Sequence, residues 1–161
     1  MSDLDVQQET DIVWPNGELV TVTSIDAWSE HARTSVTPAP LADDGQLRGP
    51  DWVIRELDLI SHMAGQMVVV VKNAGALRRV RSRALKRARA AARGRHAELK
   101  GTAQTAAVDL DVVDEQAEYD EAAIAEEYAR HIADLVAERK STVQTMSRQV
   151  EILFRDAARG L

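Results

Sequence analysis

The residues best suited to do chemistry form one basic run, residues 77–96 (LRRVRSRALKRARAAARGRH), within a stretch from residue 59 to 97 that holds no Asp or Glu. Eight of its nine basic side chains are arginines, and an arginine fork can hold a phosphate through two hydrogen bonds. A helix with this composition can neutralise a nucleic-acid backbone and release its counterions. The predicted nucleic-acid-binding residues are Arg78, Arg79, Arg81, Arg83, Lys86, Arg87, Arg89, Arg93 and Arg95.

Neutralisation within the protein is a second interpretation of this run. Residues 1–50 carry nine acidic and two basic side chains, residues 51–100 carry four and twelve, and residues 101–161 carry thirteen and six. If the basic helix folds against the acidic last third, its arginines can pair with carboxylates there and never meet a nucleic acid. The candidates are Asp109, Asp114, Glu118, Asp120, Glu121, Glu126 and Glu127. An anionic membrane surface is a third target of such a run. Nine bases around one helix exceed what one acidic helix covers, so the nucleic-acid interpretation stays open.

Other kinds of chemistry find no pattern to carry them. The chain has no cysteine, which excludes disulfides and thiolate sites. It has no glycine-rich phosphate loop, no HExxH motif and no nucleophile elbow. The four histidines lie far apart, and the acidic cluster at residues 109–115 lacks the spacing of a calcium loop, so we interpret it as a helix start. We expect no enzymatic activity, no catalytic residue, no metal and no cofactor.

The first 50 residues are expected to form an appendage and a linker. Residues 1–34 comprise an acidic tail, a small β-hairpin over DIVWPNGELVTVT (11–23) around a Pro-Asn-Gly turn, and a short helix over residues 25–33. Thr23 followed by Asp26 resembles a capping box for that helix. Residues 35–50 contain three prolines and two glycines, which predicts a linker.

Residues 51–161 are predicted to form a helical domain. Apolar residues recur at helical spacing over residues 54–71, and we predict a helix there although MVVVV (67–71) is also consistent with a buried strand. The basic run continues as a helix up to a break at Gly101. A heptad seam then follows over residues 122–157, with Arg139 as its one charged member.

The simplest fold is a long antiparallel helical hairpin, with helix 76–100 on helix 110–160. The predicted fold class is therefore mainly α and coiled-coil-like, with the small N-terminal β-hairpin as an appendage. A seam of this length needs a partner helix, so we also predict a homo-oligomer. The predicted oligomer or helix interface comprises Ile132, Val136, Val143, Met146, Val150 and Leu153.

Three tryptophans, Trp14, Trp28 and Trp52, lie in or beside the N-terminal part. They could stack on bases, but core or subunit-docking roles are the favoured interpretation. The basic run itself contains no aromatic residue, which argues against a stacking platform within it. The N-terminus lacks the apolar core of a signal peptide, and no apolar stretch approaches the length of a membrane span. We expect a soluble, cytoplasmic protein that does not associate with membranes.

Two stretches, ALKRARAAARGRHAELKG (84–101) and ERKSTVQTMSRQVEILF (138–154), resemble small helical bacteriophage proteins, in particular the UvsY-type recombination mediators. The resemblance implies an oligomeric, ring-forming accessory factor that binds single-stranded DNA, helps to load a recombinase and has no catalytic residues. It points to the basic residues of 78–95 and, further, to Arg139, Lys140 and Arg148 as DNA contacts. The alternative function is a structural or protein-interaction component, such as a virion assembly part, a scaffold or an inhibitor of a host factor.

Overall fold

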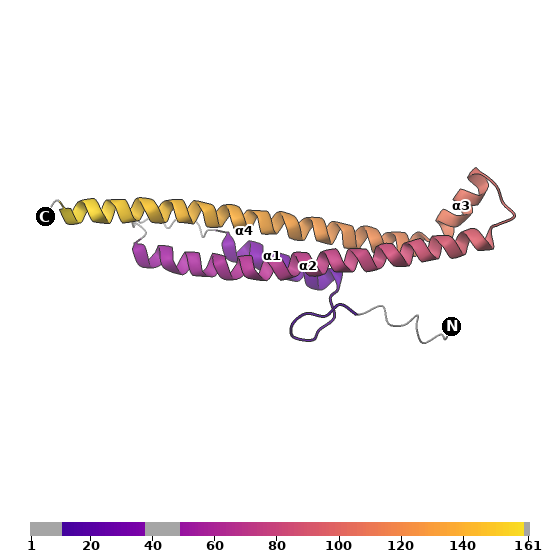
Figure 1. The fold of residues 1–161 in the computed structure, drawn as a ribbon, viewed down its shortest axis with the longest axis horizontal. Helices are drawn as coiled ribbons and strands as arrows, with labels where there is room; N and C mark the ends of the chain where they lie inside the picture. The colour runs from indigo at the N-terminus through magenta and orange to yellow at the C-terminus, as the bar shows by residue number, and fades with distance from the viewer. Residues whose placement is uncertain (1–10, 38–48, 160–161) are drawn as a thin grey trace.

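A computed structural model describes residues 11–37 and 49–159, and its helices form a long rod (Figure 1). The helices are α1 (Val22–Val36), α2 (Pro50–Arg95), α3 (Thr102–Asp111) and α4 (Val113–Arg159). The prediction of a mainly α-helical chain is confirmed. The predicted tail (1–10) and most of the predicted linker (38–48) lie outside the described residues.

The rod is built on two helices, α2 of 46 residues and α4 of 47 residues, which lie side by side and antiparallel (Figure 1). At 1.5 Å per residue each helix is about 70 Å long. The seam of α4 is almost entirely buried and consists of Ala122, Ala125, Ala129, Ile132, Val136 and Val143. The facing residues of α2 are Val53, Ile60, Met63, Met67, Val70, Ala74 and Leu77.

The run Met67–Val71 belongs to α2 and not to a strand. Met67 and Val70 are buried against α4 and α1, whereas Val68 is 70% exposed. This three- to four-residue rhythm is that of a helix, because a strand would bury every second residue. The helix also passes Gly65 and Gly75 without interruption. The sequence pattern placed Ile54 on the buried face, but this side chain is 58% exposed, so the predicted phase was wrong at the start of α2.

Helix α1 packs on both α2 and α4 and buries Ile25, Ser29, Ala32 and Val36. It begins earlier than predicted, because the capping box is formed by Thr21 and Ser24 and not by Thr23 and Asp26. The Thr21 hydroxyl accepts a hydrogen bond from the Ser24 backbone amide, and the Ser24 hydroxyl accepts one from the Thr21 amide.

The predicted β-hairpin at residues 11–23 is not supported. Within the described residues no strand forms, and the segment holds one isolated antiparallel bridge between Val13 and Leu19 around a turn at Gly17. Trp14 and Val20, which flank the turn, are buried against the helices. A two-stranded ribbon is marginal by itself, and here the segment gains its stability from packing on α1 and α2.

Arg139, the charged member of the α4 seam, pairs with Glu56 of α2. The guanidinium lies 2.8 Å from the carboxylate, and only 13% and 18% of the two side chains are exposed. Within the described residues, the arginine Nε is buried without a hydrogen-bond partner. A half-satisfied charge pair in a seam fixes the register of two helices more than it stabilises them.

We expect Arg139→Leu to destabilise the protein by about 3 kcal/mol, because it leaves the Glu56 carboxylate desolvated and unpaired. Combining it with Glu56→Leu should restore the stability of the unsubstituted protein or exceed it, since two apolar side chains then meet in the seam. Urea denaturation of both single variants and the double variant, followed by circular dichroism, measures the coupling. A loss of stability in the double variant equal to the sum of the losses in the two single variants would contradict this account.

A second polar contact joins α1 to α4. The Glu30 carboxylate accepts hydrogen bonds from Arg33 on its own helix and from the Tyr128 hydroxyl of α4, the latter at 2.9 Å. Arg33, and then Tyr128, hold the pKa of Glu30 at about 2, below its ordinary value of 4.5. The same contact raises the pKa of Tyr128.

Because the pKa of Glu30 is lower in the folded chain, its ionised form stabilises the fold above about pH 4.5 and loses that effect as the pH falls toward 2. We expect Glu30→Gln to be less stable than the unsubstituted protein at pH 7 and to match it only below about pH 2. Urea denaturation at several pH values tests this. Glu127→Gln, at an exposed position, is the control, and its stability relative to the unsubstituted protein should not change with pH in this way. A stability difference that stays constant with pH would refute the role of Glu30.

Candidate nucleic-acid interface

The basic run forms the last five turns of α2, beyond the part that α1 covers (Figure 1). Alanine, leucine, arginine and lysine are strong helix formers, which explains why the helix continues through so many like charges. It ends at Arg95, and a turn with Gly101 at φ 62° leads into α3. Leu85 and Ala92 of α2 pack against Val108 of α3 and Val112, which follows α3. These four residues form a second small core.

Four of the nine predicted contact residues face the other helices and have partners there. Arg78 lies 3.3 Å from Glu126, Arg81 lies 2.6 Å from Glu118, and Arg95 lies 2.8 Å from Asp111. Arg89 donates a hydrogen bond to the side-chain carbonyl of Gln116 at 2.9 Å. We refer to Arg78, Arg81, Arg89 and Arg95 as the inner basic residues.

The most buried of these partners is Glu126, which is only 5% exposed. Arg78 and Arg130 both donate to its carboxylate, and Arg78 also donates to the Tyr119 hydroxyl at 3.2 Å. These contacts with Tyr119 and Glu126 raise the pKa of Arg78. A Cβ at Gly75 would approach Glu126 Oε1 to 3.3 Å, so glycine gives the buried carboxylate its room. Sequence pattern alone does not distinguish this buried glutamate from the exposed acidic residues of α4.

At the tip of the rod, Asp111 closes the turn between α2 and α3. Its carboxylate accepts hydrogen bonds from Arg95 and lies 3.1 Å from His96 Nε2. Arg95, and then His96, lower the pKa of Asp111. Asp114 and Glu115 lie in the first turn of α4, as predicted for an acidic helix start, but Asp109 and Asp111 lie in the last turn of α3, so for them the prediction was wrong. Among the residues that the structure describes, no three His, Asp or Glu side chains are arranged to hold a metal ion.

Four other residues of the run, Arg79, Arg83, Lys86 and Arg93, are exposed and make no ion pair or hydrogen bond with any described residue. Lys72 shares both properties. These five positions are separated by seven, four, three and seven residues, so they lie on one face of α2. We call them the outer cationic row; the row extends over about 32 Å of helix. Arg87, the ninth residue of the run, lies beside this row and has a contact of its own.

Lys72 was not among the predicted contacts because it precedes the run. The sequence signal that identifies Lys72 is its seven-residue spacing to Arg79, Lys86 and Arg93. The outer row and the inner basic residues differ in the same property, their position around the axis of α2.

The exposed face of α4 carries the opposite charge. Asp120, Glu127 and Asp134 follow one another at intervals of seven residues and are exposed. Glu127 and Asp134 have no ion pair or hydrogen bond within the described residues, and Asp120 accepts one hydrogen bond from Gln116. Two outward faces of one rod therefore carry charges of opposite sign at matching intervals.

The predicted interface residues of α4 are used mainly inside the chain. Ile132, Val136 and Val143 are buried in the seam, and Met146 and Val150 are half-buried. Leu153 is 67% exposed, as is 59% of Phe154. α4 continues beyond the start of α2 (Figure 1), which is why the last seam residues have no partner helix within the described residues.

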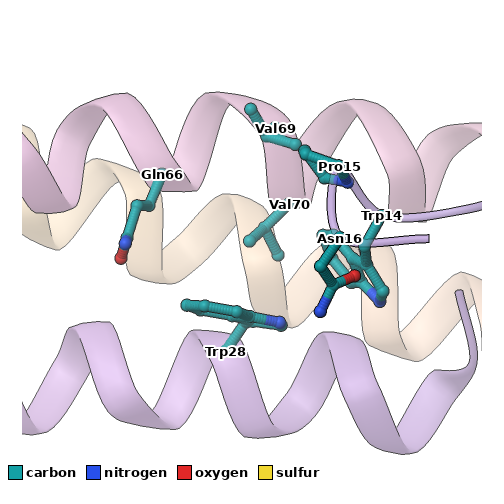
Figure 2. Close-up of a pocket in the computed structure, with 7 residues that line it drawn as sticks. All are labelled: Trp14, Pro15, Asn16, Trp28, Gln66, Val69 and Val70. Carbon is teal, nitrogen blue, oxygen red and sulfur yellow. The ribbon is translucent and has the colours of Figure 1, made fainter. Parts of the chain in front are cut away.

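Trp14 and Trp28 meet in a cavity of about 290 Å³ between the Gly17 turn, α1 and α2 (Figure 2). Their ring centroids are 6.1 Å apart. Trp14 is buried and its indole N–H donates to the Ser24 hydroxyl at 3.0 Å, so this ring serves the core as expected. Trp28 is 36% exposed and forms an accessible aromatic wall. Trp52, the third tryptophan, packs half-buried against the main core.

A scan against models of protein families, a search among curated proteins and a search among solved structures each found no match for this chain. In the described part of the chain, no helix combines the length and apolar character needed to cross a membrane. Function is therefore argued from the placement of the side chains.

The inner and outer basic residues should differ in their effect on stability. We expect Arg78→Gln, Arg81→Gln and Arg95→Gln together to lower the free energy of unfolding by about 1 kcal/mol, the scale for partly exposed ion pairs. For a chain of this size that is a fall in Tm of roughly 2–4 °C. Arg79→Gln, Arg83→Gln and Arg93→Gln together change the net charge equally and should leave Tm unchanged or slightly higher. Thermal denaturation of the two triple variants compares them, and equal shifts would contradict the division.

Proposed function

We propose that this protein is a non-enzymatic accessory protein that binds single-stranded DNA through the outer cationic row. The observation that carries the proposal is the row itself: five exposed cations without partners among the described residues, on one face of a straight helix. Arginine and lysine in this arrangement meet successive phosphates and need no base-specific contact. The remaining basic side chains of the run then position α2 against α4 and α3.

The row fits a backbone-reading role because its side chains are exposed and make no ion pair with a described residue, although Arg79 lies near Glu126 and Arg93 borders a pocket with Asp109. The carboxylates nearest to the run, Asp111, Glu118 and Glu126, are engaged by the inner residues at 2.6–3.3 Å. The acidic row of α4 lies on another face. A polyanion that approaches α2 from outside therefore meets unpaired cations, although the chain as a whole has a formal net charge of −6.

The resemblance to the UvsY-type mediators favours single-stranded DNA and a role in phage recombination or replication, in the cytoplasm and together with a recombinase or another phage or host protein. An oligomer is part of this proposal. Leu153 and Phe154 are exposed where α4 extends beyond the start of α2 (Figure 1). They give a second copy an apolar helix face on which to pack. Oligomerisation would place several outer rows side by side, and each additional row adds phosphate contacts.

A second candidate is a structural or protein-interaction component of an assembly. The observation that favours it is the acidic row Asp120, Glu127 and Asp134, whose seven-residue interval matches that of Lys72, Arg79, Lys86 and Arg93. These rows lie on different faces of the rod, so contact between two copies would be head-to-tail and would generate rings or filaments.

For the proposed function, we expect the affinity for a labelled single-stranded oligonucleotide to fall about 10²-fold between 50 and 200 mM salt. Each phosphate contact on a single strand contributes about −0.7 to the slope of log K against log salt concentration, so five contacts give about −3.5. Arg79→Gln, Arg83→Gln and Lys86→Gln together leave two contacts and should reduce the slope to about −1.4. Fluorescence anisotropy measures both quantities.

The matched control is Arg55→Gln, Arg155→Gln and Arg159→Gln, which removes the same charge from exposed positions outside the row and outside the contacts that the resemblance implies, and should leave the slope near −3.5. Absence of binding at 50 mM salt would overturn the proposed function. The second candidate would take its place if the protein binds no DNA but associates with itself, and if this association is lost in the variant that combines Asp120→Asn, Glu127→Asn and Asp134→Asn.

A further inference from the structure

The cavity between Trp14 and Trp28 opens beside the start of the outer cationic row. Val69 and Val70 of α2 form one side of it, Pro15 and Asn16 of the turn form another, and Trp28 projects into it from α1 (Figure 2). Lys72 follows Val69 by three residues, which places the two side chains about 5–6 Å apart on neighbouring turns. Lys72 thus neighbours Val69 on the helix, although it does not line the cavity itself and also borders a second, apolar pocket on the α4 side of α2.

We propose that this cavity receives one unpaired base of the strand whose phosphates lie on the outer cationic row. This inference rests on the proposed function and adds a reason for single-strand preference. A base has two apolar faces and a polar edge, and it can enter a side pocket only when it is not paired in a duplex. Stacking on an aromatic side chain is the usual way in which proteins hold such a base.

The wall chemistry of the cavity suits a base more than an aliphatic group. Trp28 contributes an indole ring that is 36% exposed, whereas Trp14 beside it is 5% exposed and fixed by its bond to Ser24. Trp14 thus holds the cavity open while Trp28 is accessible to a ligand. Trp28 also has His31 edge-on at 6.3 Å, which supports the indole from the side of α1.

Gln66 provides the polar partner on the rim. Its Nε2 lies 3.0 Å from His62 Nε2, and its carbonyl oxygen has no hydrogen bond within the described residues. The amide of Asn16 is used within the turn, where it binds Glu18 through both of its ends. One amide that is free to accept, beside an aromatic wall, can hold the polar edge of any base. The cavity should therefore bind bases without a strong sequence preference.

The arrangement also supplies what the basic run lacks. The run itself has no aromatic residue, so cations alone would bind single and double strands with similar contacts. A cavity at one end of the row changes this balance, because only a strand with accessible bases gains the stacking contact. Since α2 provides both Val69 and the row, the helix fixes their relative position.

The test compares the full-length protein with Trp28→Leu, which keeps an apolar side chain but removes the aromatic face, and with Trp28→Phe, which keeps a smaller ring. The probes are a single-stranded oligonucleotide, an abasic strand of the same length and a duplex, at 50 mM salt. We expect Trp28→Leu to weaken binding of the single strand about 5- to 150-fold, the range for loss of one stacked base. Binding of the abasic strand and the duplex should not change, and Trp28→Phe should recover part of the loss.

The outcomes separate this inference from the proposed function. If the protein binds all three probes and Trp28→Leu leaves every affinity unchanged, the inference is overturned. The proposed function stands in that case. Equal weakening toward all three probes would overturn it too, because it would assign Trp28 to the fold. No binding to any probe overturns the proposed function and the inference together. Quenching of tryptophan fluorescence by the single strand, reduced in Trp28→Leu, is the supporting spectroscopic result.

Discussion

The structure depends on the close packing of α2 against α4. Just before the basic run of α2, the residues of the two helices that face each other are small. They are Ala74 and Gly75 on α2, and Ala122, Ala125 and Ala129 on α4. Small side chains let two helices lie close together over a long distance. Neither helix can bury its apolar face without the other, because helices in water gain most of their stability from such packing.

This contact divides the basic run by helical phase. Residues that point toward α4 and α3 are drawn into ion pairs, because the small seam brings the carboxylates of those helices within 2.6–3.3 Å of them. Arg79, Arg83, Lys86 and Arg93 are exposed and make no ion pair with a residue that the structure describes. Internal neutralisation therefore accounts for Arg78, Arg81 and Arg95, whereas the outer cationic row has no such pairing within the described residues.

Much of the helical domain could be predicted because its pattern is periodic and long. The heptad seam of α4 identified Ala122, Ala129, Val136 and Val143, which are buried, and its one charged member proved to be paired across the seam with Glu56. The N-terminal part was less predictable. A few alternating residues around a Pro-Asn-Gly turn are typical of a hairpin, but burial of Trp14 and Val20 against the helices replaces strand pairing.

The candidate site was predicted as a region but not as a surface. Composition located residues 77–96, yet composition cannot tell which side of a helix faces a neighbour, and that depends on the phase of α2 relative to α4. Lys72 was missed because it lies outside the dense run, and the tryptophan cavity was missed because it joins residues 14, 28 and 69 from three separate segments. Only the tertiary packing brings such residues together.

One rigid helix carries both the cations and one wall of the tryptophan cavity, and this has a consequence for how a strand would bind. Between Val69 and Arg93, α2 is uninterrupted, so the spacing of these groups is set before any ligand arrives. Binding then orders only the side chains at the surface, which limits the entropic cost of association. The cavity lies at one end of the row and not along it, so the two ends are not equivalent. In the proposed complex, a strand with one base beside Trp28 and its phosphates on the row extends from Trp28 toward Arg93.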